Sequence, residues 1–548
     1  MRRALWNLLR SDNGSVAPTV ALSIVALIAI GGISFDYARV ASMDTELQNA
    51  ADQAALAAAS QLDGQAGACA RAAAAAASLL TNNTLFANET GGTRPVVIAN
   101  ESACDATGSI RFYQDYDQVN DTFGAAATSD ANAEVVLVAV NPREAFYALT
   151  PVVGAMRSGS IGAQAIARLG SAICKMPPVM ICNPDEVGGN LSFEPALYAG
   201  KGLRLTSVGG GGGGWVPGNF GYLDTEISEV SGEVNQLRSA LGWNTPPGNC
   251  VAADNVDTKP GATVTVTDAV NTRFDIYENQ NTSCWGSGTC SPAINSRKDV
   301  VRPANANGGN ACKLNNAGWQ LPPNYYGSGT FPPAGSATPL DPSVTPGAMG
   351  LPRDMCHAAS AAGVCTSGYE GRIGNGAWDR DAYFRTNYVR TSMGSGGQAV
   401  GSRWTAAEWQ ANTGLPANAK RWDVYQWEIN NRGTIKDGVQ VLGPRLLPGE
   451  SLPGGLTDYG DPQCQPAAPT TLHDRRRIAV AVVNCQAQSV NGSSSNVRVL
   501  KWIDVFLTEP SVNRERTSNG DIYAEVIGET QQAGVNAPIR RDVPYLIR

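Results

Sequence analysis

An uninterrupted apolar stretch near the start of the chain constrains the fold more than any other feature. Residues Val16–Phe35 (VAPTVALSIVALIAIGGISF) carry no charged side chain over twenty positions. A helix of that length spans about 30 Å, the thickness of the hydrocarbon core of a bilayer. The sequence therefore predicts a single transmembrane helix whose ends are Val16 and Phe35.

The charges on either side of this helix predict its orientation. Arg2, Arg3 and Arg10 precede the helix, whereas acidic residues dominate the segment that follows it. Loops rich in Lys and Arg stay in the cytoplasm, so we expect residues 1–15 to be a cytoplasmic lead and the remainder to be exported. A cleaved signal peptide is the alternative. Its apolar core is usually only about 7–15 residues long, and the helical pattern here continues beyond the apolar stretch.

An alanine-rich segment extends the helical pattern. Ala is the best helix former, and Val40, Met43 and Leu47 begin an apolar stripe at helical spacing that alanines continue to Ala58. Gly64 marks the expected end, so the rod should run to about residue 62. The stripe predicts a packing surface, either against the protein's own domain or against a partner helix, and we favour the first.

The first sixty residues also combine several short motifs. A basic lead precedes GSVAP at the start of the apolar helix, and DYAR and LQNAADQAALAAA follow it. This arrangement resembles the N-terminal segment of TadE/TadG-like proteins of the bacterial Tad (Flp, tight-adherence) pilus-assembly system. The resemblance implies a single-pass inner-membrane protein with pilus-assembly or pilin-like partners, no cofactor and no enzymatic activity. The matching residues are Gly14, Ala17, Asp36, Leu47, Gln48, Ala50, Ala51, Asp52, Ala54, Ala55, Leu56 and Ala57.

More distant segments extend the resemblance, and one motif departs from it. Similar stretches are CKMPPVMICNP at 174–184, PGNFGYL at 217–223, NTRFDIY at 271–277 and RRIAVAVVNC at 476–485. Some TadG-like proteins carry a von Willebrand A domain with a D-x-S-x-S metal motif. That motif is missing from this sequence, so we expect no such metal site.

The remaining sequence predicts an α+β fold. We expect the long helix to pack on a small antiparallel sheet in a pilin-like domain over 36–172. A Gly- and Pro-rich insert over 173–460 and a C-terminal β region over 461–548 would form a loop-rich, mainly β ectodomain. Expected helices are 68–80, 224–241 and one starting at Thr405. Expected strands are 95–99, 110–116, 134–140, 160–167, 262–267, 422–428, 477–484, 497–507 and 521–527.

All twelve cysteines follow the apolar helix, which indicates disulfides in an oxidising compartment. No C-x-x-C pair occurs and the chain has only two histidines, so a structural zinc site is disfavoured. Sequence does not fix the pairing. The short-range candidates are Cys174–Cys182, Cys284–Cys290, Cys356–Cys365 and Cys464–Cys485.

Charge and motif content argue against other functions. A net charge of −7 without a Lys/Arg stripe disfavours nucleic acid as a partner. The nearest nucleophile elbow, at 449–453, ends in Pro, and Cys356 beside His357 is expected in a disulfide. The alternative function is a surface adhesin or carbohydrate-binding protein, although the aromatic residues that suggest it are more simply a domain core. These are Trp378, Tyr383, Phe384, Tyr388, Trp422, Tyr425 and Trp427.

Overall fold

A computed structural model groups the chain into two compact units. The first unit contains Met1–Ser171 and Asp542–Arg548, and the second contains Ala172–Arg541. The structure describes residues 16–547 except for 80–82, 85–93, 96–102, 118–119, 154–155, 175–178, 208–218, 225–226, 228–229, 249–250, 253–254, 260–265, 279–283, 359–364, 366–371, 447–454, 471, 473, 492, 517–519 and 531–538.

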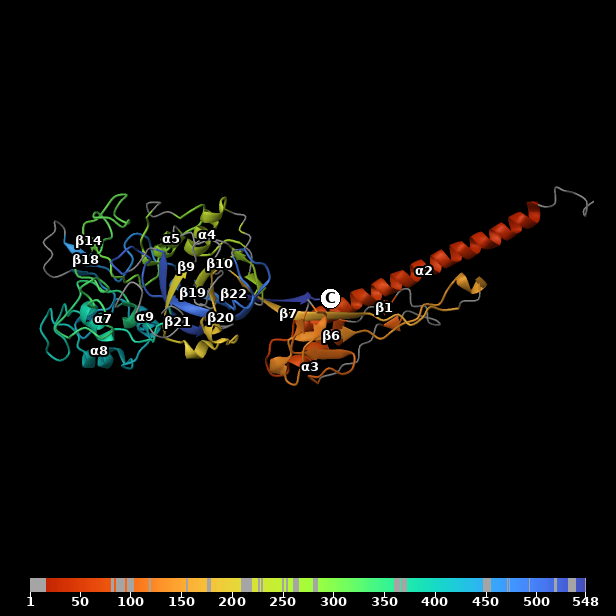
Figure 1. Ribbon diagram of the computed structural model, residues 1–548, viewed down its shortest axis with the longest axis horizontal. Coiled ribbons are helices and arrows are strands. Elements are labelled where there is room, and N and C mark those ends of the chain that lie inside the picture. Colours follow the sequence, from red (N-terminus) through yellow and green to blue (C-terminus); the bar gives the residue numbers. More distant parts are fainter. Residues whose placement is uncertain are drawn as a thin grey trace, which may run out of the picture. The chain divides into compact units, whose positions relative to one another are not determined.

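Helix α2 (Val16–Ala59) dominates the first unit (Figure 1). It confirms that the apolar stretch and the alanine-rich segment form one helix, which ends three residues before the expected position. Two serines in the apolar part donate back to the carbonyl four residues earlier, Ser23 to Thr19 at 2.8 Å and Ser34 to Ile30 at 2.9 Å. Such bonds satisfy the serine hydroxyls within the helix itself.

The alanine-rich half of α2 packs on α3 (Ala68–Leu79) and on an antiparallel sheet. The central strand β6 (Val135–Ala139) pairs with β3 (Ile110–Tyr113) and with β7 (Gln164–Cys174). The other elements of this unit are β1 (Asn83–Thr84), β2 (Arg94–Pro95), β4 (Tyr116–Asp117), β5 (Thr122–Phe123), η2 (Asp130–Asn132), η3 (Thr150–Val153) and the end of β22 (Ile539–Leu546), which pairs with β7.

Six strands of the second unit pair in a closed ring. The order is β20, β19, β8, β10, β9 and β21, and β21 pairs back to β20. Alternate side chains from these strands share one apolar cluster, as the inward positions of a closed sheet do. The bounds are β8 (Val179–Cys182), β9 (Gly202–Ser207), β10 (Asn219–Leu223), β19 (Arg477–Val483), β20 (Val497–Leu507) and β21 (Asp521–Glu529).

The boundary expected at residue 460 does not separate two compact units. Strands β19 to β21, which follow it, belong to the same ring as β8 to β10.

The helices of this unit are α4 (Glu233–Gly242), α5 (Thr267–Asn271), α6 (Met355–Ala358), α7 (Arg380–Asn387), α8 (Ala406–Thr413) and α9 (Arg421–Asn430). Short elements are β11 (Val251–Ala252), β12 (Asn255–Val256), β13 (Thr258–Lys259), β14 (Arg302–Pro303), β15 (Ile435–Lys436), β16 (Val439–Gln440), β17 (Arg445–Leu446), β18 (Leu456–Asp458), η4 (Pro184–Gly188), η5 (Pro195–Leu197) and η7 (Thr272–Phe274).

The strand expected over 262–267 lies outside the described residues up to 265, and Thr267 begins α5. Two other secondary-structure predictions in this unit are wrong. The segment 422–428 is not a strand but the middle of α9, where Asp423 accepts a hydrogen bond from the Lys420 amide at the helix start. The helix expected over 224–241 begins only at Glu233, because Gly232 before it has a φ of 86° and breaks the helical path.

Two of the predicted disulfides are also wrong. Cys182 does not pair with Cys174 but with Cys485, at a Cα–Cα distance of 5.3 Å, because parallel pairing of β8 with β19 brings the ends of these strands together. Cys464 pairs with Cys312 instead of Cys485. Cys284–Cys290 and Cys356–Cys365 are formed as expected, and Cys69–Cys104 is a further pair. The side chain of Cys174 lies outside the described residues.

Removal of Cys182–Cys485 should destabilise the second unit more than removal of Cys284–Cys290. The sequence separations are 303 and 6 residues, and loop-closure entropy assigns about 5–6 kcal/mol to the longer loop and about 2 kcal/mol to the shorter. Double alanine variants of each pair, compared by denaturant unfolding of the full chain, test this difference. Equal losses would contradict the entropic explanation.

Candidate functional site

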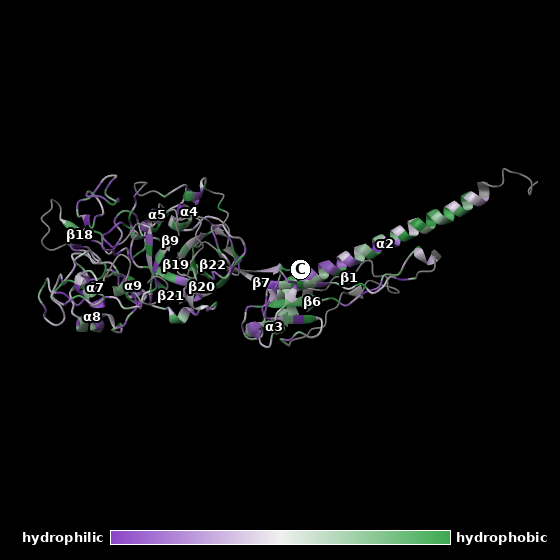
Figure 2. Cartoon of the chain, in the orientation of Figure 1, coloured by the Kyte–Doolittle hydropathy of each residue, from purple (hydrophilic) through white to green (hydrophobic). Residues whose placement is uncertain are grey.

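The first half of α2 presents apolar side chains on all sides. Leu22 is 72% exposed, Leu27 is 68% exposed and Ile30 is 64% exposed, and Figure 2 shows this half of the helix as predominantly hydrophobic. It is the one described helix that is long and apolar enough to cross a membrane, with 6% of its most apolar window buried. Such exposure is unfavourable in water and favourable in a bilayer.

The second half of α2 is buried on one side by its own domain. Met43, the central alanines of the stripe and Leu62 share an apolar cluster with α3 and with inward residues of β3, β6 and β7. The expectation that the stripe packs within its own domain is therefore confirmed. The family-motif residues in this cluster are Leu47, Ala50, Ala51, Ala54 and Ala55, each at most 2% exposed.

The two polar family-motif residues of this half are Gln48 and Asp52, and Gln48 links the helix to the sheet. Gln48 donates through its side-chain amide to Asp52 Oδ1 at 2.8 Å and to the carbonyl of Gln164 at 3.1 Å. Gln164 is the first residue of β7. Gln48 and Asp52 thus join the edge of the alanine packing surface to the start of a strand.

Asp36 lies at the boundary between the two halves and forms the most specific contact of the helix. Its side chain is 1% exposed. The carboxylate accepts hydrogen bonds from the backbone amides of Ala148, Leu149 and Thr150 at 2.7–2.9 Å, and from the Thr150 hydroxyl at 2.7 Å. These three amides come at the start of η3, where backbone donors have no partner within the turn. We call this set of contacts the Asp36 latch.

The latch stabilises the ionised form of Asp36. Burial by itself would raise the pKa of the carboxyl, but the hydrogen bonds from Thr150, Ala148 and Leu149 outweigh it and lower the pKa well below its ordinary value. Asp36 is therefore a carboxylate at neutral pH, and its charge is satisfied within the protein at the point where the exposed apolar half of α2 ends.

A second side chain of the DYAR motif supports the same loop. Arg39 Nη1 lies 3.5 Å from the carbonyl oxygen of Phe146. Asp36 and Arg39 are one helical turn apart, so they contact the loop through its amides and one of its carbonyls respectively. The D-x-x-R spacing thus holds residues 146–150 against the helix.

Gly32 allows this loop to approach the apolar helix. A Cβ placed on Gly32 would lie 2.9 Å from the Cβ of Leu149, whereas one placed on Gly31 would have no neighbour within 4 Å. The lack of a side chain at Gly32 therefore allows Leu149 of the loop to pack against the helix.

Substitution of these two glycines should have different effects. Gly32→Val must displace Leu149 near its backbone, and we expect it to destabilise the latch by about 1–3 kcal/mol. Gly31→Val is the matched control and should leave the latch intact. Hydrogen exchange at the amides of 148–150, measured on the full chain in detergent, reports the result; equal protection in both variants would contradict the steric argument.

The aromatic residues of the second unit do not form an exposed platform. Trp378, Tyr383, Phe384, Tyr388 and Tyr425 are at most 2% exposed and belong to one cluster. Trp422 and Trp427 pack against it. The interpretation of these rings as a domain core is therefore confirmed.

The adjacent Cys356 and His357, which the sequence analysis disfavours as a nucleophile and base, do not form a catalytic pair with a free thiol. Cys356 is bonded to Cys365, so it offers no thiolate, and His357 beside it is 1% exposed. Ser451 lies outside the described residues. Among the described residues one Cys/Asp group has metal-like spacing, Cys69, Cys104 and Asp130, but its two sulfurs are joined in a disulfide.

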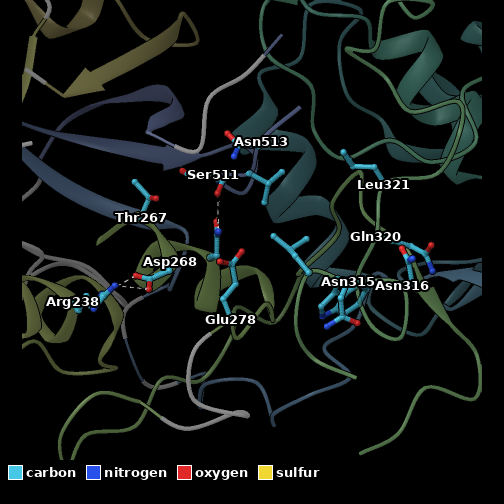
Figure 3. Close-up of a pocket in the computed structure, with 14 residues that line it drawn as sticks. Arg238, Thr267, Asp268, Glu278, Asn315, Asn316, Gln320, Leu321, Ser511 and Asn513 are labelled. Atoms are coloured by element: carbon cyan, nitrogen blue, oxygen red, sulfur yellow. Dashed lines mark hydrogen bonds and ion pairs between the residues drawn. The ribbon is translucent and has the colours of Figure 1, made fainter. Parts of the chain in front are cut away.

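The second unit contains a polar pocket of about 470 Å³ (Figure 3). Arg238 forms an ion pair with Asp268 at 3.1 Å at one side of it. Burial, and then the charge of Asp268, raise the pKa of Glu278 nearby. The lining side chains can hydrogen-bond a small polar molecule. Trp319 offers no face for stacking, because it is fully buried and Lys298 Nζ lies 3.6 Å from its ring centre.

The sequence predicts helix α2 but does not predict the loop, residues 146–150, that the helix holds. In the sequence, Asp36 stands out only as an acid of the flank and as part of the DYAR motif, and nothing in residues 146–150 indicates a carboxylate-binding turn. The available signal was a single acid directly after a twenty-residue apolar stretch, since such a charge needs internal partners or water. The pocket joins residues from 238 to 513, a combination that only the folded chain brings together.

A model of a known protein family matches this helix. Residues 14–61 match the model of a family described as putative Flp pilus-assembly TadE/G-like. The matched range contains the apolar half of α2, Asp36 and the alanine packing surface. The resemblance read from the sequence is thereby confirmed for this segment. Neither the curated proteins nor the solved structures include a match to the chain.

Proposed function

We propose that this chain is a membrane-anchored, non-enzymatic component of Flp pilus assembly that binds pilin or secretion proteins through its exported part. The match over residues 14–61 supports a part in this system. The observation that carries the proposal is the division of α2 at Asp36 into a lipid-facing half and a half buried in its own domain. Such a helix anchors a folded domain directly at the membrane surface.

The division of α2 also limits where partners bind. The alanine surface is occupied by α3 and the sheet, so a partner helix cannot use it without unfolding the domain. The accessible side of the exported half carries polar residues instead. These are Tyr37, Asp44, Thr45, Asn49 and Gln53. We propose that partners contact this side or the second unit, with residues 1–15 in the cytoplasm and the bulk of the chain beyond the inner membrane.

Surface pili provide the test of this function. In the bacterium that carries the chain, deletion of its gene should abolish or strongly reduce Flp pili seen by electron microscopy, and the full chain should restore them. A chain in which residues 1–35 are replaced by a cleavable signal peptide should be exported but should not restore pili. Normal piliation in the deletion strain would overturn the proposal.

A further inference from the structure

We propose that the loop held by Asp36 is a membrane-inserted foot, in which Leu149 and Met156 enter the same leaflet as the outer end of the apolar helix. The inference rests on the membrane anchoring proposed above. Its occupant is the lipid bilayer, and the contact would fix the depth and the tilt of the first unit at the membrane.

The position of the loop along the helix is the first argument. Leu149 approaches Gly32, where an added Cβ would lie 2.9 Å from its own Cβ. Gly32 precedes Asp36 by four residues, which corresponds to about 6 Å along a helix axis. Leu149 therefore lies beside the lipid-facing half of α2, at the shallow depth that interfacial segments of membrane proteins occupy.

The exposed side chains of the loop are the second argument. Leu149 is 46% exposed and Met156 is 65% exposed, and Ile33 and Phe35 on the adjoining helix are 49% and 52% exposed. Leu149, which lies beside Gly32, extends the exposed apolar surface of α2 onto the loop, and Met156 is a further exposed apolar side chain of the loop. The sequence from 145 to 156 (AFYALTPVVGAM) has no charge and includes Tyr147, and Tyr is enriched at membrane interfaces.

Polar contacts mark the base of the loop. Phe146 forms a β-bridge with Arg157, whose guanidinium lies 5.2 Å from the Phe146 ring centre and 3.2 Å from Glu144 Oε2. The charges thus begin where the apolar stretch ends, as expected at the level of lipid headgroups. The Asp36 latch also favours insertion of the loop into the membrane. Its four hydrogen-bond donors satisfy the Asp36 carboxylate, and a carboxylate without such donors would oppose insertion.

Depth-dependent quenching tests the foot. The full chain is reconstituted in vesicles of phosphatidylcholine and phosphatidylglycerol that carry a nitroxide either near the headgroup or near the end of the acyl chain. An environment-sensitive fluorescent amino acid replaces Leu149 or Met156, one at a time. Val25, in the middle of the apolar stretch, reports the anchor, and Leu197, which is 67% exposed in the second unit, reports water.

The foot predicts a blue-shifted emission at 149 and 156 that the shallow nitroxide quenches more than the deep one. The probe at 25 should show the reverse preference, and the probe at 197 should show no quenching. Quenching at 25 without quenching at 149 and 156 would overturn the foot and leave the anchor intact. A blue shift without quenching by either lipid would mean that protein covers the loop, which also overturns it. No quenching at 25 would remove the anchor and the foot together.

Discussion

Asp36→Ala is expected to destabilise the first unit by about 2–4 kcal/mol. The substitution removes the acceptor for the amides of Ala148, Leu149 and Thr150, and a hydrogen bond to a charged group contributes about 1.5–3 kcal/mol. The effect should appear as lost hydrogen-exchange protection at 148–150 in the full chain in detergent. Asp44→Ala is the matched control, since Asp44 is exposed on the same helix, and it should change stability by less than about 0.5 kcal/mol.

The latch should also weaken in acid. The pKa of Asp36 is lowered in the folded protein, so its contribution is fully present above the ordinary aspartate pKa of about 3.9 and is lost as the pH falls toward the folded pKa. Protection at 148–150 should therefore decrease below about pH 4. Asp36→Asn should lack this pH dependence. A wild-type profile that is as flat as that of the variant would contradict the assignment.

Arg421→Ala is expected to destabilise the second unit by about 3–5 kcal/mol. Arg421 binds Asp354 and Glu525, and all three side chains are fully buried. Arg421 also donates to the carbonyl of Pro352. Loss of the guanidinium leaves two buried carboxylates without their cation, which is costlier than loss of an exposed pair. Denaturant unfolding of the full chain measures the difference.

Arg432→Ala is the control for this variant, because Arg432 pairs with Asp461 at 2.8 Å but is 44% exposed. It should change stability by less than about 1 kcal/mol. The penalty for Arg421→Ala should shrink as the pH falls. Burial already raises the pKa of Glu525, and loss of Arg421 raises it further, so protonation relieves the unpaired charge. A penalty that grows in acid would contradict this explanation.

Local patterns predicted the parts of the fold that depend on neighbours in sequence. The helical stripe from Met43 to Ala58 predicted both α2 and its packing side. Alternation predicted β20 at its observed bounds, Val497–Leu507. The segment 422–428 is not recognised as a helix because two of the four fully buried positions of α9, Arg421 and Glu428, are charged. Its apolar residues alone therefore do not show the helical period.

Contacts between distant residues could not be predicted in this way. The Cys182–Cys485 disulfide depends on parallel pairing of two strands almost 300 residues apart, and the shorter Cys174–Cys182 loop looked equally suitable. The Asp36 latch joins residues more than 110 positions apart through backbone amides, which carry no side-chain signature. In both cases the deciding partner is fixed by topology and not by local composition.

Cross-linking of the full chain in bacterial membranes tests the proposed function most directly. The chain, tagged at its C-terminus, is cross-linked beyond the inner membrane, captured and compared with an unrelated soluble protein fused to residues 1–35. Recovery of pilin or pilus-secretion subunits with the full chain, and not with the fusion, is the predicted result. Recovery of the same proteins with both, or of no pilus component with the full chain, would contradict a partner-binding role for the exported part.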